Sequence, residues 1–151
     1  TLAASGWASA APLPGGGQLV TERRGAGVIA LIAPPGGLAL ISCLAPALAF
    51  GSTVCAWTPE GDLAAALAYA ARAAGLPAGV MSVLAEPPPA LDALAGADRV
   101  WWFGRAPDGV PEGLSLWAEP TGRDWHGPDG AAPDLGLAVT KPRTVSLPGG
   151  V

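Results

Sequence analysis

Residues 27–60 read GVIALIAPPGGLALISCLAPALAFGSTVCAWTPE, and this stretch decides the fold of the chain. Residues 27–33 are a short unbroken apolar run, which is typical of a parallel strand buried on both faces. Residues 38–50 are apolar nearly all round and predict a buried helix, with Pro46 kinking it or marking its last turns. Residues 52–57 are small or branched and predict a second strand. The stretch therefore predicts a strand–helix–strand unit, with a loop at 34–37.

The alternation continues towards the C-terminus. Thr58 is placed to cap the next helix, with Pro59 in its first turn, and Gly75 to end it. The pattern predicts a helix at 60–74, a strand at 80–84, a short helix at 88–94 and a strand at 99–103. Repeated alternation of this kind predicts the α/β class, an open parallel sheet with helices on both faces.

The flanking segments are less regular. Residues 1–17 are rich in small residues and glycine and are predicted to be a flexible lead-in, so that 18–151 make up a single domain. Residues 18–24 predict a strand. Beyond Gly104 the pattern fades, with strands predicted at 114–118 and 136–139 and a polar connection at 121–133.

Composition narrows the classes of function. The chain has 151 residues, enough for one domain with a core, and its 50% hydrophobic and 13% charged residues argue against disorder. Its basic residues form no cluster beyond Arg23 and Arg24, which argues against a nucleic-acid partner. Residues 28–50 carry no charge and are long enough to cross a bilayer, but 34–37 interrupt them with prolines and glycines, so no membrane association is expected. Without a signal peptide pattern, we expect a cytoplasmic protein in which Cys43 and Cys55 are buried free thiols.

Several separated motifs in order resemble the cofactor-binding core of the aldehyde dehydrogenase superfamily. Residues 45–49 read APALA before a Gly-x-Thr-Val, 76–80 read LPAGV before a strand, and Asp98-Arg99-Val100 leads to Phe103-Gly104. The resemblance covers residues 20–105 and implies a Rossmann-like cofactor domain. The scaffold positions that match in the first stretch are Gly27, Val28, Pro34, Ala45, Pro46, Ala47, Leu48, Ala49, Gly51, Thr53, Val54, Pro59 and Glu60.

The catalytic positions that the resemblance implies are changed. The family uses a Cys nucleophile well after the fourth strand, and no Cys follows Cys55. Pro35 and Gly36 stand where the family has Trp and the Asn that stabilises the oxyanion. The closest match to the family's Glu-Leu-Gly-Gly-Lys base motif is WAEPTG at 117–122, and its departures predict that Glu119 is a solvated loop carboxylate. We therefore assign no catalytic residue.

The cofactor positions are changed as well. The resemblance implies that Pro34, Glu60, Gly104 and Arg105 are vestiges of an NAD site, with Trp57 in place of the ribose-binding Lys. Glu60 is equally explained by its place at a helix N-terminus, and residues 107–109 predict that the helix which would hold the pyrophosphate is lost. We therefore expect no cofactor, with weak NAD binding through Glu60 and Arg105 left as the alternative. Bulky Trp57, Trp101 and Trp102 are hypothesised to fill the unused crevice.

A metal site is not expected. His126 is the only histidine, and with Asp124 and Asp129 in a glycine- and proline-rich segment it is better explained as a surface residue.

These observations predict a non-catalytic, pseudoenzyme domain, most similar to the second, incomplete copy in the tandem-domain aldehyde dehydrogenases of family sixteen. That resemblance implies a structural or protein-interaction role beside an aldehyde dehydrogenase catalytic domain, in the same chain or in a homo-oligomer. The alternative is the NAD-binding portion of an NAD(P)-dependent aldehyde dehydrogenase that oxidises aldehydes to acids, with its catalytic Cys outside this chain.

Overall fold

A five-stranded parallel sheet forms the body of the molecule. The computed structural model describes residues 8–14, 16–33, 37–105, 107–119, 123–125, 135 and 138–148. The strands lie in the order β5-β4-β3-β6-β7, and each neighbouring pair is parallel. They are β3 (Val28–Ile32), β4 (Thr53–Trp57), β5 (Met81–Leu84), β6 (Arg99–Phe103) and β7 (Leu116–Glu119). The predicted open parallel sheet of the α/β class is confirmed.

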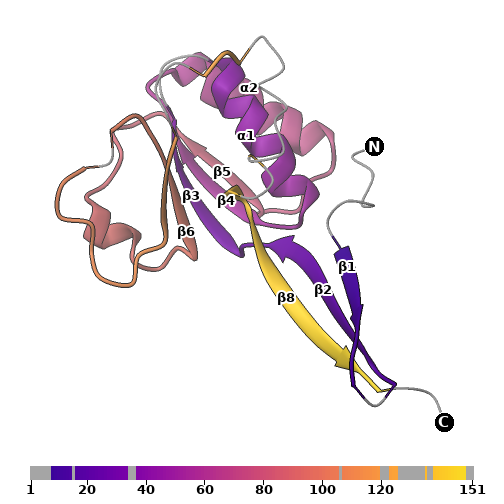
Figure 1. The fold of residues 1–151 in the computed structure, drawn as a ribbon. Coiled ribbons are helices and arrows are strands. Elements are labelled where there is room, and N and C mark those ends of the chain that lie inside the picture. Colours follow the sequence, from indigo (N-terminus) through magenta and orange to yellow (C-terminus); the bar gives the residue numbers. More distant parts are fainter. Residues whose placement is uncertain are drawn as a thin grey trace.

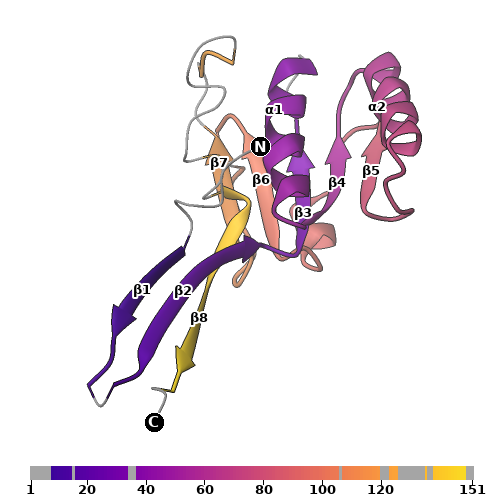
Figure 2. The ribbon, with the colours of Figure 1, turned by 90° about the vertical axis from the view of Figure 1, so that its right-hand side faces the viewer.

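Helices cover the two faces of this sheet unequally. Helices α1 (Gly37–Ala49) and α2 (Gly61–Ala73) lie on one face, as Figure 2 shows, and pack with Ile29 and Leu31 of β3. The opposite face carries Ala30 and Ile32, covered by the single-turn 3₁₀ helix η2 (Leu91–Leu94) and the segment before β7. The alternation of β3 side chains between two apolar clusters is the expected result for a strand buried on both faces.

Helix α1 is buried only on the face that it turns to the sheet, because Leu38 and Ile41 on its outer face are exposed, so the prediction of a helix buried nearly all round is wrong. Ala39, Leu40, Cys43, Leu44 and Ala47 face the sheet. Pro46 lies inside the helix, one turn from its end, and because it has no amide hydrogen it cannot donate to the carbonyl four residues earlier. No described helix is long and apolar enough to span a lipid bilayer, and residues 28–50 divide instead into β3 and α1.

A second, antiparallel sheet projects from this body, and Figures 1 and 2 show it extending away from the helices. Its strands are β1 (Ala8–Pro12), β2 (Gln18–Gly25) and β8 (Thr140–Leu147), in the order β1-β2-β8. We call this sheet the arm. Its junction with the body is held by backbone hydrogen bonds from Gly25 to Phe50 (3.0 Å) and from Ala26 to Val139 (2.9 Å).

The structure differs from the sequence predictions in the arm. Residues 8–12 fall in the segment predicted to be a flexible lead-in, yet they form β1, because their backbone pairs with β2 from Ala8↔Glu22 to Pro12↔Gln18. The strand predicted at 136–139 is wrong: Leu135 and Ala138 are helical and Val139 is in a turn. The strand is instead β8, which begins one residue later.

Two other local predictions need correction. Thr58 does not cap α2; its hydroxyl accepts a hydrogen bond from the Glu60 amide (3.3 Å), and Glu60 itself occupies the N-cap position without a capping side-chain bond. The short helix predicted at 88–94 is limited to the single turn η2, because prolines at 87–89 supply no amide hydrogens. Neither change alters the order of the sheet.

Gly27 is a required glycine, and its substitution tests the junction between arm and body. It has φ +110°, and a Cβ there would overlap the Asp98 carboxylate, which accepts a hydrogen bond from the Val28 amide (2.8 Å). Gly27→Ala should therefore lower the free energy of unfolding by about 2 kcal/mol or more, measured by urea denaturation. Gly96→Ala is the matched control, because a Cβ at Gly96 meets nothing within 4 Å. Equal stabilities of the two variants would contradict this account.

Candidate functional site

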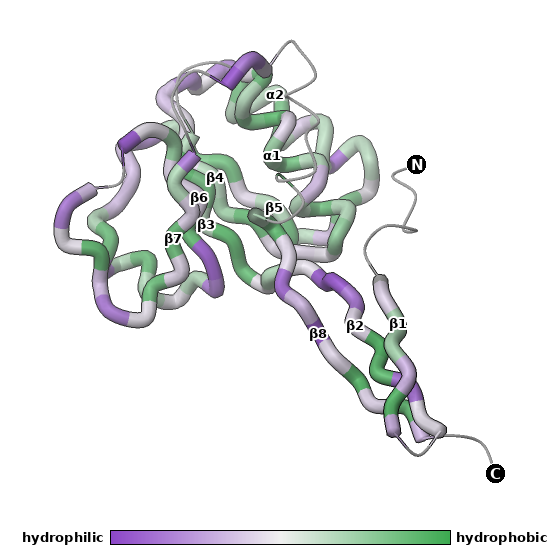
Figure 3. Tube along the Cα trace, in the orientation of Figure 1, coloured by the Kyte–Doolittle hydropathy of each residue, from purple (hydrophilic) through white to green (hydrophobic). Residues whose placement is uncertain are grey.

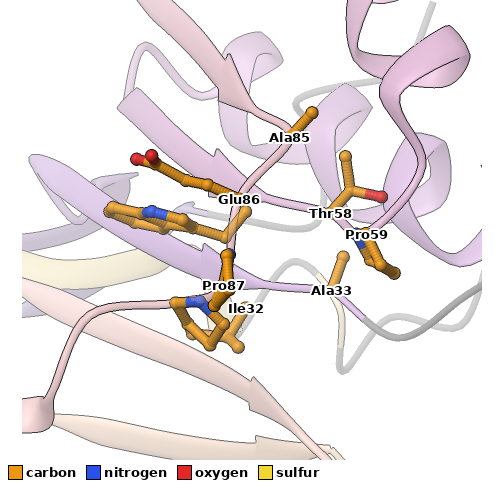
Figure 4. A pocket seen from close by; sticks show the side chains of 9 residues that line it. Ile32, Ala33, Thr58, Pro59, Ala85, Glu86 and Pro87 are labelled. Carbon is orange, nitrogen blue, oxygen red and sulfur yellow. The ribbon is translucent and has the colours of Figure 1, made fainter.

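A cavity opens at the carboxyl ends of three neighbouring parallel strands. It measures about 480 Å³ and is lined by residues that follow β3, β4 and β5: Ile32, Ala33, Trp57, Thr58, Pro59, Ala85, Glu86, Pro87 and Pro88. Figure 4 shows the Glu86 carboxylate on one side and Pro59 with Thr58 on the other. Open parallel sheets bind their ligands outside the carboxyl ends of the strands, so this is the candidate site of the fold.

The predicted cofactor residues are not gathered around this cavity. Glu60 follows the lining residue Pro59 but is not part of the lining, and Pro34 lies outside the described residues. Gly104, with φ +93°, ends β6, and its amide donates to the Glu119 carbonyl (3.1 Å). The Arg105 side chain is 91% exposed and lies 4.0 Å from Asp108.

The three tryptophans hypothesised to fill the crevice, Trp57, Trp101 and Trp102, lie in three different places. Trp57 lines the cavity and leaves it open. Trp101 is fully buried in the cluster under α1, whereas Trp102 belongs to the cluster on the opposite face and lines a separate hollow beside η2. The two residues do lie on opposite faces of β6, but neither fills the cavity, so the hypothesis of a sealed crevice is wrong for the part of the site that the structure describes.

A buried carboxylate lies at the end of β7. The Glu119 side chain has no exposed surface, and its oxygens accept hydrogen bonds from the indole nitrogens of Trp101 (3.3 Å) and Trp117 (3.4 Å). It also forms an ion pair with Arg123, whose side chain is 10% exposed. Arg123 in turn lies 5.3 Å from the centre of the Trp125 ring, a cation–π distance.

The prediction that Glu119 is a solvated loop carboxylate is therefore wrong. A buried carboxylate is stabilised only when it is paired and hydrogen-bonded, and Glu119 obtains both from Arg123 and the two indoles. The sequence carried one signal for this arrangement, since Arg123 stands four residues after Glu119. The two tryptophan donors come together only through the pairing of β6 with β7, in which Trp101 is opposite Trp117.

The two cysteines differ in their surroundings. Cys43 is fully buried on α1, as predicted, and burial and then the charge of Glu119 raise the pKa of its thiol, which Arg123 only partly offsets. Cys55 is half-buried, contrary to the prediction, because it lies on the less covered face of β4; burial and then the charge of Glu86 raise its pKa. Both thiols are kept protonated, which is the opposite of what a nucleophile needs.

Metal-binding side chains are not brought together. Among the described residues, no group of three His, Cys, Asp or Glu side chains is arranged to hold a metal ion. His126 and Asp129 lie outside those residues.

No protein-family model and no curated protein matches the sequence, but solved structures match the fold. An indole-3-acetaldehyde dehydrogenase in its apo form has a TM-score of 0.63 at 27% identity, over 76% of this chain and 30% of that one. The aldehyde dehydrogenase KauB from Pseudomonas aeruginosa has a TM-score of 0.60 at 26% identity, over 78% and 27%. The chain has an aldehyde dehydrogenase-like fold.

The aldehyde dehydrogenase-like fold is shared with cofactor-bound structures too. The glyceraldehyde-3-phosphate dehydrogenase GapN from Methanocaldococcus jannaschii, complexed with NADP, has a TM-score of 0.57 at 18% identity, over 78% of this chain and 29% of that one. This chain therefore spans less than a third of the length of each of these three proteins.

The described residues fit a dinucleotide only in part. The cavity beside Trp57 and Pro59 has room for part of a nucleotide. A pyrophosphate, however, needs amide donors at a helix N-terminus, and no helix occurs among the described residues between β6 and β7. The side chain of Arg105 points to solvent rather than to the cavity. We therefore derive no reaction step through a cofactor.

The Glu119 network can be tested by removing its charge. Glu119→Gln keeps the size of the side chain but leaves the buried Arg123 without its carboxylate, and should lower the free energy of unfolding by about 3 kcal/mol. Glu112→Gln, in the exposed turn before β7, should change it by less than about 0.5 kcal/mol. Urea denaturation at pH 7 measures both, and similar midpoints and slopes for the two variants would contradict the role of the ion pair.

Proposed function

We propose that this chain is a non-catalytic aldehyde dehydrogenase-like domain whose role is to bind an aldehyde dehydrogenase catalytic domain, in the same chain or in another copy. Two sets of observations support the proposal. The first is the loss of the chemistry that the family resemblance implies. The second, which carries the proposal, is the arm.

Within this chain, the residues that the family resemblance implies for the nucleophile, the oxyanion and the base are absent or changed. No Cys follows Cys55, and the thiol of Cys43 is buried with a raised pKa. Gly36 offers no side-chain donor to an oxyanion, and loss of one such donor alone lowers a rate by about a hundred-fold or more. The remaining carboxylate in the right part of the sequence, Glu119, is sealed among Trp101, Trp117 and Arg123.

The arm is a thin sheet without a core of its own. Within the described side chains of its three strands, only Thr140 is buried, and most of β8 is exposed. Three-stranded sheets are stable when they pack one face against another layer. The outer edge of β8 also has no partner strand among the described residues, and such edges readily pair with another chain.

One face of the arm carries apolar side chains suited to such packing. Val20 and Val145 are directly opposite each other and Leu147 lies two residues further along, so the three share a face. Leu147 is 46% exposed. We call Val20, Val145 and Leu147 the arm patch. The arm patch lies towards the Leu147 end of β8, away from the junction at Thr140, and this position favours contact with a separate domain rather than with the body of this molecule.

The alternative function is the cofactor-binding portion of an NAD(P)-dependent aldehyde dehydrogenase whose nucleophile lies outside this chain. One observation favours it: the cavity at the carboxyl ends of β3, β4 and β5 stays open beside Trp57. It requires the pyrophosphate to be held by residues other than those described between β6 and β7.

Titration with NAD⁺ and NADP⁺ separates the two proposals. Because no described helix between β6 and β7 supplies amide donors for the pyrophosphate, we expect no saturable heat in isothermal titration up to millimolar nucleotide. Trp57→Lys, which restores a cation at the edge of the cavity, should not produce tight binding either, because the ribose contact alone leaves the pyrophosphate unsatisfied. Micromolar binding by the natural chain would contradict the non-catalytic proposal and support the alternative.

The arm patch can be tested through self-association. If another copy is the partner, sedimentation velocity should show association that rises with concentration, and Leu147→Lys should weaken it about tenfold or more because it buries a charge in the contact. Ser146→Lys is the matched control, since Ser146 lies on the opposite face of the same strand.

Equal association of the Leu147→Lys and Ser146→Lys variants would exclude the arm patch as the contact. A natural chain that stays monomeric at every concentration would exclude the homo-oligomer and leave a catalytic domain of the same chain as the partner.

A further inference from the structure

Basic side chains gather where the arm joins the body. Strands β2 and β8 carry Arg23, Arg24, Lys141 and Arg143 against a single acidic residue, Glu22, although the whole chain has a net charge of −4. Figure 3 shows both strands hydrophilic near the body and more apolar towards the tip. The positive charge is thus concentrated at one place in an acidic protein.

Strand alternation divides these charges between two faces of the arm. Arg24, Lys141 and Arg143 share one face with Glu22, which pairs with Arg24 (2.7 Å) and lies 4.0 Å from Arg143. Lys141 lies 4.0 Å from Asp98. Each charge on this face therefore has a counter-charge nearby.

Arg23 points to the other face. Its Nη1 donates to the hydroxyl of Thr140 (3.0 Å), and among the described residues no carboxylate lies within 4 Å of its guanidinium. The side chain is half-buried, so solvent screens its charge less than that of a fully exposed arginine. Its positive charge is not balanced by an ion pair within the part of the chain that the structure describes.

A second guanidinium lies beside it. Arg99, at the start of β6, donates from Nη1 to the carbonyl oxygens of Ala138 (2.7 Å) and Thr140 (3.4 Å), and from Nε to the Ser115 hydroxyl (3.3 Å). Arg23 and Arg99 thus both bind Thr140, one from the arm and one from the body. Burial and then the positive charge of Arg23 lower the pKa of Arg99, as expected for two cations held close together.

We propose that Arg23 and Arg99 form a binding site for a small oxyanion, a phosphate or carboxylate group, at the junction of arm and body. Guanidinium groups bind such anions through paired hydrogen bonds, and two neighbouring guanidiniums favour an oxyanion over chloride. Neither residue belongs to the cavity at the carboxyl ends of the strands, so the site is separate from the candidate nucleotide site.

The site has a consequence for the arm. Arg23 belongs to β2 and Arg99 to β6, so an anion held by both connects the two sheets. Because the arm otherwise joins the body through the backbone bonds at Gly25 and Ala26 and the ion pair of Lys141 with Asp98, a bound anion stiffens this junction. The anion is either a free phosphate or a carboxylate presented by a ligand or a partner protein.

The test is a titration of the whole chain with inorganic phosphate and, separately, with succinate, at constant ionic strength maintained with sodium chloride. The thermal midpoint should rise and saturate with the preferred anion, since a ligand that binds only the folded state stabilises it. A response to phosphate alone identifies a phosphate site, and a response to succinate alone identifies a carboxylate site.

Variants locate the site. Arg23→Gln should weaken the anion affinity about tenfold, the effect of losing one charge-assisted hydrogen-bond partner. Arg23→Lys should give an intermediate loss, because it keeps the positive charge but not the paired N–H donors of the guanidinium. Arg24→Gln is the matched control on the opposite face and should bind the anion as the natural chain does. The proposal is overturned if the natural chain shows no saturable response beyond chloride, or if Arg23→Gln and Arg24→Gln respond alike.

Discussion

Strand β3 is the constraint on which the rest of the structure depends. Its side chains are apolar on both faces, and it pairs with β4 on one edge and β6 on the other. A strand of this kind is stable only when layers cover both faces and strands cover both edges. Helix α1 and η2 supply the layers, and the chain must cross the sheet after β5 to place β6 on the free edge. That crossing places the reversal of strand order between β3 and β6, and the cavity lies beside it, at the carboxyl ends of β3, β4 and β5.

The parts of the fold that could be predicted are those whose signals are local. The strands β3, β4, β5 and β6 and the helices α1 and α2 each have an apolar pattern within a short stretch, and their positions agree with the prediction to within about two residues. Strand β8 could not be predicted in this way. Its sequence, TKPRTVSL, is exposed on both faces, so it has no apolar alternation, and its partner β2 lies more than a hundred residues away.

The site was less predictable than the fold for a related reason. That Glu86 lines the cavity follows from its place two residues after β5, a signal available in the sequence once the parallel sheet is assumed. The burial of Glu119 does not follow from its neighbours in sequence, because a carboxylate in a polar stretch ordinarily faces solvent. Its burial depends on Trp101, which reaches it across the sheet. Contacts of this kind, between residues far apart in the sequence, leave no periodic pattern from which they could be predicted.

The two unusual charges of the molecule also show which positions the fold constrains and which it leaves free to vary. Positions inside the sheet must stay apolar or be paired, and Glu119 satisfies this rule through Arg123. Positions at the ends of the strands face loops and solvent, where Trp57 lines the cavity without disturbing the layers beneath. At the junction with the arm, Arg23 lies between these cases: it is half-buried, yet no described carboxylate balances it. Burial without compensation is costly in a stable fold, and this is the physical reason to look for an anion there rather than at the exposed Arg105.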